Sequence, residues 1–195
     1  MSSLGQLSFL LAPLILGGVS NMVLVKLPVL TSLKQPMDGG RVLRDGQRLF
    51  GDNKTWKGFL GMIVLTAGWF TLTWALVTAL PALQPLALMP FEEYGPGVAV
   101  IFGAWWGLAY VLAELPNSWM KRRLHIAPGK QPPGARRALF AFVDQADSAV
   151  GCLVAMLVFF RPSAVDWLAA LALAIAFHYG LNLLLFAVGL KRDAG

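Results

Sequence analysis

Five long apolar runs, separated by polar segments, limit what this chain can fold into. A helix needs roughly 20 apolar residues to cross the hydrocarbon core of a membrane, and each run reaches or approaches that length. The runs cover residues 7–25, 59–80, 98–115, 140–160 and 167–190. The sequence therefore predicts an all-α polytopic membrane protein with about five transmembrane helices, folded as a single membrane-embedded domain over residues 1–195.

Composition supports a membrane protein. The 195 residues are 57% apolar and only 13% charged, whereas soluble globular domains carry about 25% charged residues. A disordered chain would need low hydrophobicity and high charge, so this composition excludes that class. The single cysteine, Cys152, excludes an intramolecular disulfide and any multi-cysteine metal site.

The positive charges indicate how the chain is oriented. Of the 16 Lys and Arg residues, seven lie in segment 26–57, six in segment 116–139 and two at the C-terminus. Because Lys and Arg concentrate in cytoplasmic loops, we expect both segments and the C-terminus in the cytoplasm and the N-terminus outside, in the cell (inner) membrane. Basic residues placed in blocks between apolar runs do not form the continuous soluble face of a nucleic-acid binder, so no nucleic-acid partner is expected.

The first polar cluster runs from Asp38 to Gly58 and interleaves aspartates, basic residues and glycines. Glycines allow the backbone to approach a ligand closely, which favours a phosphate-binding loop. The alternative is a solvated loop held inside by its positive charge. A Walker loop is excluded, because two residues separate Gly51 from Lys54.

The second cluster, residues 114–123, ends in three consecutive cations, Lys121, Arg122 and Arg123. They could anchor a helix end to anionic headgroups or neutralise a polyphosphate. Neighbours on a helix do not share a face, so we expect at least one of the three to be an anchor or a loop contact. Glu114, at the end of a span, needs a partner or a polar cavity.

The third cluster holds Asp144 and Asp147, which are i, i+3 and share one face of a helical turn. Helix capping would explain one aspartate. Two carboxylates on one face suit Mg²⁺ better, since this ion is typically held by one or two carboxylates and substrate phosphates. His178 and Asn182, i, i+4 on the fifth run, are interpreted as a polar pair that joins helices.

Four short motifs connect these clusters to a known family. Asn21 to Pro28 is followed by P-M-D at residues 36–38, and residues 48–58 read R-L-F-G-D-N-K-T-W-K-G. Residues 118–124 read S-W-M-K-R-R-L, and residues 144–147 read D-Q-A-D. Together they resemble the CDP-archaeol synthases, integral-membrane cytidylyltransferases related to the CDP-diacylglycerol synthases.

Three positions depart from that family pattern. Ala113-Glu114 stands where the family usually has Gly-Asp, Trp119 replaces Phe, and residues 132–137 lengthen the second loop. A glutamate can do the work of an aspartate with a longer reach.

The resemblance implies an enzyme that uses CTP and a lipid phosphate from the membrane leaflet to form a CDP-lipid and pyrophosphate for phospholipid biosynthesis, with Mg²⁺ as cofactor and membrane lipids as surroundings. It implies metal ligands at Asp144, Asp147 and Glu114, and catalytic cations at Lys121, Arg122, Arg123 and Lys54. The implied substrate-binding residues are Asn21, Asp38, Arg48, Gly51, Asp52, Asn53, Thr55, Lys57, Gly58 and Ser118.

Two alternatives remain at this point. A CDP-alcohol phosphatidyltransferase would need D-G-x-x-A-R, but neither Asp38-Gly39 nor Asp45-Gly46 is followed by Ala-Arg at the required spacing. A non-enzymatic transporter would carry ionisable groups near the middle of several spans, whereas here only His178, with Asn182, is central.

The orientation can be tested with topology reporters. A reporter fused after Gly195 should lie in the cytoplasm, and one inserted near Glu93 should lie outside, because the segment 81–97 carries no Lys or Arg. The opposite result at both positions would overturn the predicted orientation.

Overall fold

The computed structural model describes residues 2–89, 91 and 93–187, and its architecture is helical. The helices are α1 (Leu4–Lys26), α2 (Trp56–Ala79), α3 (Pro96–Arg123), α4 (Arg136–Met156) and α5 (Ala164–Ala187), with short 3₁₀ helices η1 (Thr31–Leu33) and η2 (Pro81–Leu86). Within these described ranges there is no strand, only two isolated β-bridges. Each α-helix contains a stretch long and apolar enough to cross a membrane, which confirms the predicted all-α fold with five spans.

Each helix begins before its predicted apolar run, α2 and α4 end before the predicted ends of theirs, and α3 extends furthest beyond its predicted end. This helix continues through Pro116 to Arg123, although a proline removes one backbone N–H from the helical ladder. Since α4 begins at Arg136, the connection between the two helices is only residues 124–135, shorter than the predicted segment 116–139. The predicted end of the fifth span, residues 188–190, and the C-terminal basic pair lie outside the described residues.

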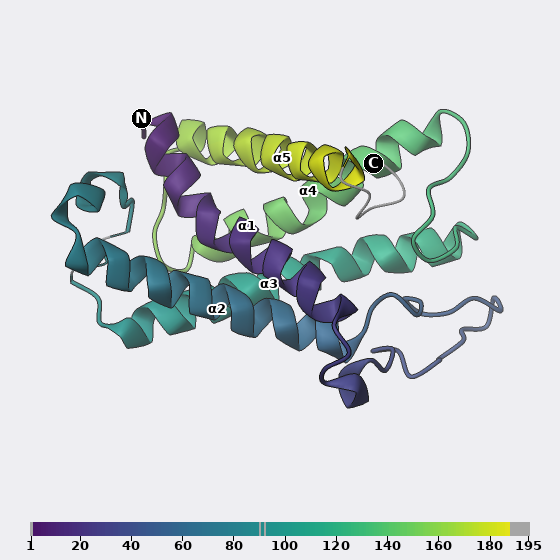
Figure 1. Cartoon of the computed structure of the whole chain (residues 1–195). Coiled ribbons are helices and arrows are strands. Elements are labelled where there is room, and N and C mark those ends of the chain that lie inside the picture. The colour runs from purple at the N-terminus through teal and green to yellow at the C-terminus, as the bar shows by residue number, and fades with distance from the viewer. Residues whose placement is uncertain (1, 90, 92, 188–195) are drawn as a thin grey trace.

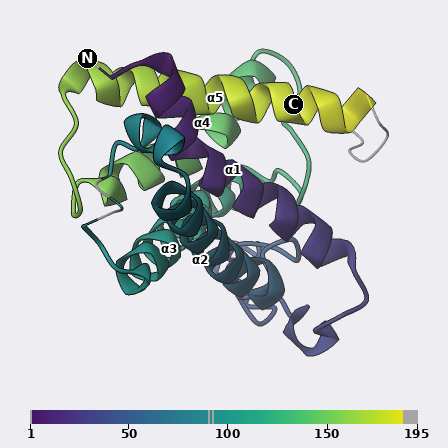
Figure 2. The same cartoon turned by 60° about the vertical axis from the view of Figure 1, so that its left-hand side comes forward.

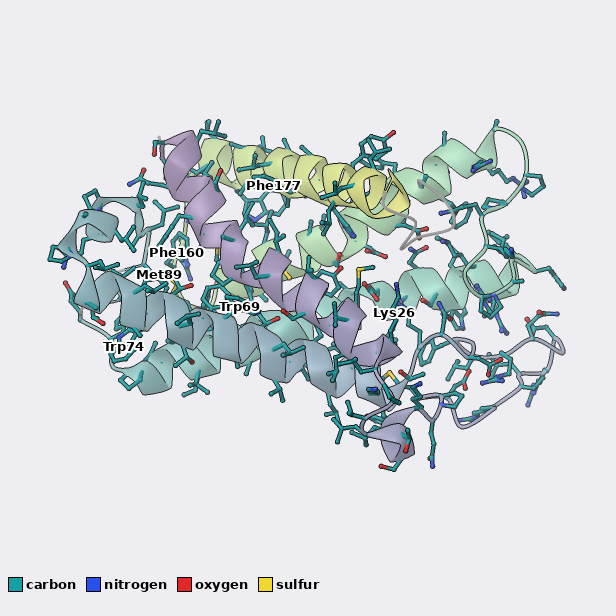
Figure 3. All side chains as sticks on the ribbon, viewed as in Figure 1. Lys26, Trp69, Trp74, Met89, Phe160 and Phe177 are labelled. Atoms are coloured by element: carbon teal, nitrogen blue, oxygen red, sulfur yellow. The ribbon has the colours of Figure 1, made fainter. Side chains whose placement is uncertain are left out.

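The two connections that carry most of the charge lie at the same end of the molecule, which we call the loop end. Figures 1 and 2 show segments 27–55 and 124–135 beside the ends of α1 and α3 and the starts of α2 and α4. In Figure 3 nitrogen and oxygen atoms gather near Lys26 at this end, while Trp74, Met89 and Phe160 lie at the opposite end. The fold therefore brings polar clusters that are far apart in sequence to one place.

Helices α1 and α5 are close at one end only. Near their starts, the Ser2 backbone N–H donates to the Asp166 carboxylate at 2.6 Å. From there the two helices diverge toward the loop end, as both views show (Figures 1 and 2).

Glycines allow α2 and α3 to pack with their backbones in contact. A Cβ added at Gly103 would lie 2.7 Å from the Ala67 Cα, and one added at Gly107 would lie 2.8 Å from the Ile63 Cα. Their spacing of four residues is the small-xxx-small pattern of membrane helix pairs. Because α3 also carries much of the polar cluster at the loop end, this close packing fixes the frame of the site.

Aromatic side chains join α2, α3 and α4 toward the opposite end. Phe70 packs edge-on against Phe102 and Trp106, with ring centroids 4.9 and 5.3 Å apart. The Trp106 indole N–H donates to the Cys152 carbonyl of α4 at 2.5 Å, which satisfies the one polar atom of a fully buried ring.

The close α2–α3 contact predicts a large effect from one methyl group. Gly107→Ala should destabilise the protein by about 1–3 kcal/mol, because its Cβ overlaps α2 backbone and the helices must separate. Gly68→Ala on α2 is the matched control, since outside the neighbouring backbone of its own helix no described atom lies within 4 Å of its added Cβ. Thermal unfolding in detergent should show a lower Tm for Gly107→Ala alone; equal Tm values for the two variants would contradict the contact.

Candidate active site

The polar cluster of α3 faces two aspartates of α4. Because α3 continues past Pro116, Glu114, Asn117 and Lys121 follow at i, i+3 and i+7 and share one helical face. The Asn117 Nδ2 donates to both Asp144, at 2.6 Å, and Asp147, at 2.8 Å. The Lys121 ammonium donates to both oxygens of Asp144 at 2.5–2.6 Å. An amide and a cation of α3 thus hold the aspartate pair of α4 together.

Lys54, from the first loop, completes this cluster by forming an ion pair with Glu114. Both side chains are largely shielded, with 20% and 27% of their surface exposed. Glu114, at the end of the predicted third span, therefore has a cationic partner, which a carboxylate at that depth needs.

These groups surround a polar cavity of about 280 Å³ at the loop end. Its walls are Asn53, Lys54, Glu114, Asn117, Ser118, Lys121, Arg122, Gly129, Lys130, Gln131, Asp144, Gln145, Asp147 and His178. Arg122 is only 4% exposed, and its Nε and Nη1 have no hydrogen-bond partner within the described part of the chain. Since a buried charge with unpaired donors is costly, the cavity is suited to an anionic ligand.

A second cavity, of about 390 Å³, extends from the polar one into the helix bundle. Its walls are mainly apolar side chains of α1, α2, α3 and α5, with Leu11, Met62 and Phe177 among them. The two cavities share Asn53, Lys54, Glu114 and His178. The Lys54–Glu114 ion pair therefore lies at the border between a polar and an apolar space.

Asp38 organises the first loop from inside. Its side chain is fully shielded and accepts hydrogen bonds from the Arg48 guanidinium and from the backbone N–H groups of Gly40, Phe50 and Gly51. Burial alone would raise the pKa of the Asp38 carboxyl, but these hydrogen bonds outweigh it and hold the pKa well below its ordinary value. The same contact, with Asp52 behind it, raises the pKa of Arg48.

The two charged connections touch each other at Gly51. This residue has a φ of +110°, and a Cβ there would lie 2.8 Å from the Pro128 ring. Glycine is therefore required both by the backbone conformation and by the neighbouring loop.

Two predicted substrate residues, Lys57 and Asp52, and the predicted catalytic residue Arg123 build the loop rather than line the polar cavity. The Lys57 ammonium, almost fully buried, donates to the carbonyls of Leu27 at 2.8 Å and Val29 at 2.6 Å. Arg123 donates to Asp45 at 2.7 Å and to the Arg48 carbonyl at 2.5 Å. Asp52 is 73% exposed beside Arg48.

Other predicted residues lie on the apolar cavity. Asn21, Thr55 and Gly58 line it, and the Asn21 amide donates to the Gly58 carbonyl at 3.0 Å. Thr55 also caps α2, since its hydroxyl accepts from the Gly58 N–H at 3.2 Å.

The polar cavity includes residues that sequence reasoning missed. The sequence does not single out Asn117, because the predicted third span ends at residue 115 and the spacing of Asn117 from Glu114 is meaningful only if the helix continues. Gln131 lies in a loop with no periodic pattern, so no sequence signal singles it out. The ring of His178 joins helices as predicted, with Nδ1 3.4 Å from the Gln145 carbonyl, and it also lines both cavities; the side chain of Asn182 lies outside the described residues.

A polar cavity at the loop end that borders an apolar cavity inside a five-helix membrane bundle suits a membrane enzyme, because a ligand from water and one from the membrane can meet there. A family model described as "CarS-like: CDP-archaeol synthase" matches residues 23–193. The chain belongs to this family and is a membrane-embedded enzyme rather than a transporter.

Curated relatives support this assignment. The CDP-archaeol synthase of Thermococcus gammatolerans is 32% identical over 169 residues, covering 84% of each chain. That of Pyrococcus furiosus is 31% identical over 170 residues, covering 84% of this chain and 86% of the relative. A solved structure described as an intramembrane enzyme for archaeal membrane lipids biosynthesis has a TM-score of 0.62, with 22% identity over 90% of this chain and 92% of that one, and this likeness supports the fold.

The role of Asp38 can be tested by proteolysis. Asp38→Asn should expose Arg41 and Arg44 to faster trypsin cleavage at neutral pH, because it removes the charge that holds Arg48 and three backbone N–H groups. Asp52→Asn, at an exposed position, is the control and should be cleaved like the wild type.

The pH dependence of the loop follows from the lowered pKa of Asp38. The ionised carboxylate stabilises the loop above the pKa of the unfolded chain, about 3.9, and this stabilisation is lost only as pH falls toward the lower folded pKa. The rate of trypsin cleavage at Arg41 and Arg44 of the wild type, relative to an unstructured peptide at the same pH, should therefore be equal at pH 7 and pH 5. A relative rate that rises between pH 7 and pH 5 would contradict the assignment.

Proposed function

We propose that this enzyme transfers the cytidylyl group of CTP to a lipid phosphate, giving a CDP-lipid and pyrophosphate for phospholipid biosynthesis. The observation that carries the proposal is the border at Lys54 and Glu114, where a polar cavity meets an apolar one. A reaction between a nucleotide from water and a phosphate on a lipid needs such a border. The CDP-archaeol synthase family of the chain supports the same reaction.

The triphosphate is assigned to the polar cavity. Lys121 and Arg122 both line it, and the buried Arg122 has donors that no described residue uses. Charge-assisted hydrogen bonds from these groups to phosphate oxygens would be strong in this shielded place.

The lipid chains are assigned to the apolar cavity. Its walls include residues of both α1 and α5, the two helices that diverge toward the loop end (Figure 2). A lipid can therefore enter sideways from the leaflet and present its phosphate at Lys54, without leaving the membrane.

The chemical step needs positioning more than a base. An oxygen of the lipid phosphate is already ionised, so it attacks the α-phosphorus of CTP directly and forms a new P–O bond. The bond between the α-phosphorus and the bridging oxygen breaks, and pyrophosphate leaves with the electron pair. Lys54, Lys121 and Arg122 hold the two phosphates close and offset their charge, which are the main contributions in such transfers.

The aspartate pair fits Mg²⁺. Asp144, Asp147 and the Oδ1 of Asn117, which is buried with no partner among the described residues, offer only oxygen atoms, the ligand type that Mg²⁺ prefers. The Lys121 ammonium, which pairs with Asp144, would have to release that carboxylate to the ion. When bound, the ion stabilises negative charge on phosphate oxygens. The described residues contain no ready group of three His, Cys, Asp or Glu ligands, and Glu114 would join only when a phosphate takes its place on Lys54.

The site is proposed to face the cytoplasm. The described part of the loop end carries most of the chain's Lys and Arg residues, and the positive-inside tendency favours its cytoplasmic placement. CTP would then reach the polar cavity from the compartment in which it is made.

The reaction is tested with purified protein, CTP, Mg²⁺ and a panel of ether- and ester-linked lipid phosphates. Mass spectrometry should detect a CDP-lipid, with one pyrophosphate per product, and a chelator should stop turnover. Asp144→Asn or Asp147→Asn should lower kcat by at least about two orders of magnitude, because they weaken the charge stabilisation. No product from any lipid phosphate would overturn the proposed function.

Neighbouring cations provide a matched comparison in the same assay. Arg122→Ala should raise the KM for CTP about tenfold or more, as expected from losing charge-assisted hydrogen bonds of about 1.5–3 kcal/mol. Arg123→Ala removes an equal charge from the next position but faces the first loop, so its KM should change much less. Small and equal effects of the two substitutions would instead favour membrane anchoring.

A further inference from the structure

A third cavity, of about 530 Å³, lies under the second loop at the side of the polar cavity. Its walls are Leu124, His125, Ile126, Ala127, Lys130, Gln131, Pro132, Pro133, Ala135, Arg136 and Phe140. Ile126, Pro132 and Phe140 are buried. Most of the other wall residues are exposed, so the cavity is open to solvent on one side. Its volume lies within the roughly 300–1,000 Å³ that is typical of small-molecule sites.

This loop cavity communicates with the polar cavity, because Lys130 and Gln131 line both. Phe140 connects them a second time. Its ring belongs to the loop cavity, and its centroid lies 5.7 Å from the Lys121 ammonium that lines the polar cavity. A ligand with a triphosphate at Lys121 can therefore extend an aromatic group toward Phe140.

The proposed reaction requires a third space of this kind. At the α-phosphorus the attacking and leaving oxygens lie roughly in line, so the nucleoside must leave that axis to the side. In the proposed arrangement the lipid occupies the apolar cavity, and the β- and γ-phosphates of CTP occupy the polar cavity. The loop cavity is the third cavity of the site, and it borders the polar cavity at Lys130 and Gln131 without including Lys54.

We propose, on the basis of the function above, that the loop cavity binds the nucleoside and that Gln131 selects bases carrying an exocyclic amine. The selecting atom is the Gln131 Oε1, which is buried and has no hydrogen-bond partner within the described ranges.

Asp144 determines which way the Gln131 amide faces. The Gln131 Nε2 donates to Asp144 Oδ2 at 2.7 Å, and an ionised carboxylate can only accept. Turning the amide round would set its oxygen against that carboxylate. The Gln131 Oε1 therefore remains available as an acceptor, and the exocyclic amine of cytosine can donate an N–H to it. Uracil presents a carbonyl oxygen at the same position, which leaves two acceptors facing each other.

The selection is tested with Gln131→Leu, which has a similar size but no polar atoms. Calorimetry should measure binding of CTP, UTP and inorganic triphosphate to the detergent-purified protein, and turnover should be measured with both nucleotides. The wild type should prefer CTP over UTP by at least tenfold. The variant should lose most of that ratio through weaker CTP binding, whereas an effect that acts only through Asp144 should change the binding of CTP, UTP and inorganic triphosphate by the same factor.

The location of the nucleoside is tested by filling the loop cavity. Ala127→Trp should weaken CTP binding at least tenfold and leave inorganic triphosphate binding unchanged, because Ala127 lines only the loop cavity. Ala138→Trp, at an exposed position outside the walls of that cavity, is the matched control and should bind both ligands normally.

The outcomes separate this inference from the proposed function. Normal cytidylyl transfer with an unchanged CTP-to-UTP ratio in Gln131→Leu would overturn the role of Gln131 and leave the function standing. Normal CTP binding in Ala127→Trp would overturn the nucleoside site. Absence of turnover in the wild type would overturn the function, and the binding ratios would still decide whether the loop cavity takes the base.

Discussion

The contact between Asn117 and Lys121 of α3 and the aspartates of α4 is the interaction on which the site depends. Two carboxylates close together at the end of a membrane bundle repel each other and are costly to shield from water. The Asn117 amide bridges them, and the Lys121 ammonium neutralises Asp144. Neither side chain could reach if α3 ended at Pro116, so the extra turns of helix beyond the apolar run are a requirement of the site.

The first loop also depends on a carboxylate that is shielded from water and paired with a cation. Asp38 gathers Arg48 and three backbone N–H groups around one buried carboxylate, which gives a loop without regular strands a defined shape. The loop then returns to the membrane beside α3, where Lys54 meets Glu114. Gly51 fits against Pro128 of the other loop, so the two connections support each other although they are far apart in sequence.

The fold could be predicted because hydrocarbon imposes length and apolar composition on each span. The resemblance to the family also implied Lys54, Glu114 and Asp144 as site residues, and the structure brings all three to the polar cavity; their roles stay predictions. Side-chain direction could not be predicted. Lys57 carries the same charge as Lys54 but binds two carbonyls at the end of α1, and only the tertiary position of that helix end decides this. The resemblance implies Arg123 as a catalytic cation, but its position on the helix directs its side chain toward Asp45 and the Arg48 carbonyl of the first loop.

The border between the cavities explains how one site can hold both the charged phosphate and the apolar chains of a lipid. An apolar wall alone would exclude the phosphate of a lipid, and a purely polar one would exclude its chains. Lys54 and Glu114 form an ion pair with no net charge, which is tolerated at the edge of the apolar cavity, and Glu114 is left as an unpaired carboxylate once a phosphate competes for the ammonium. In the proposed reaction the lipid phosphate itself opens this pair, so the full charge of the site develops only when the lipid substrate is in place.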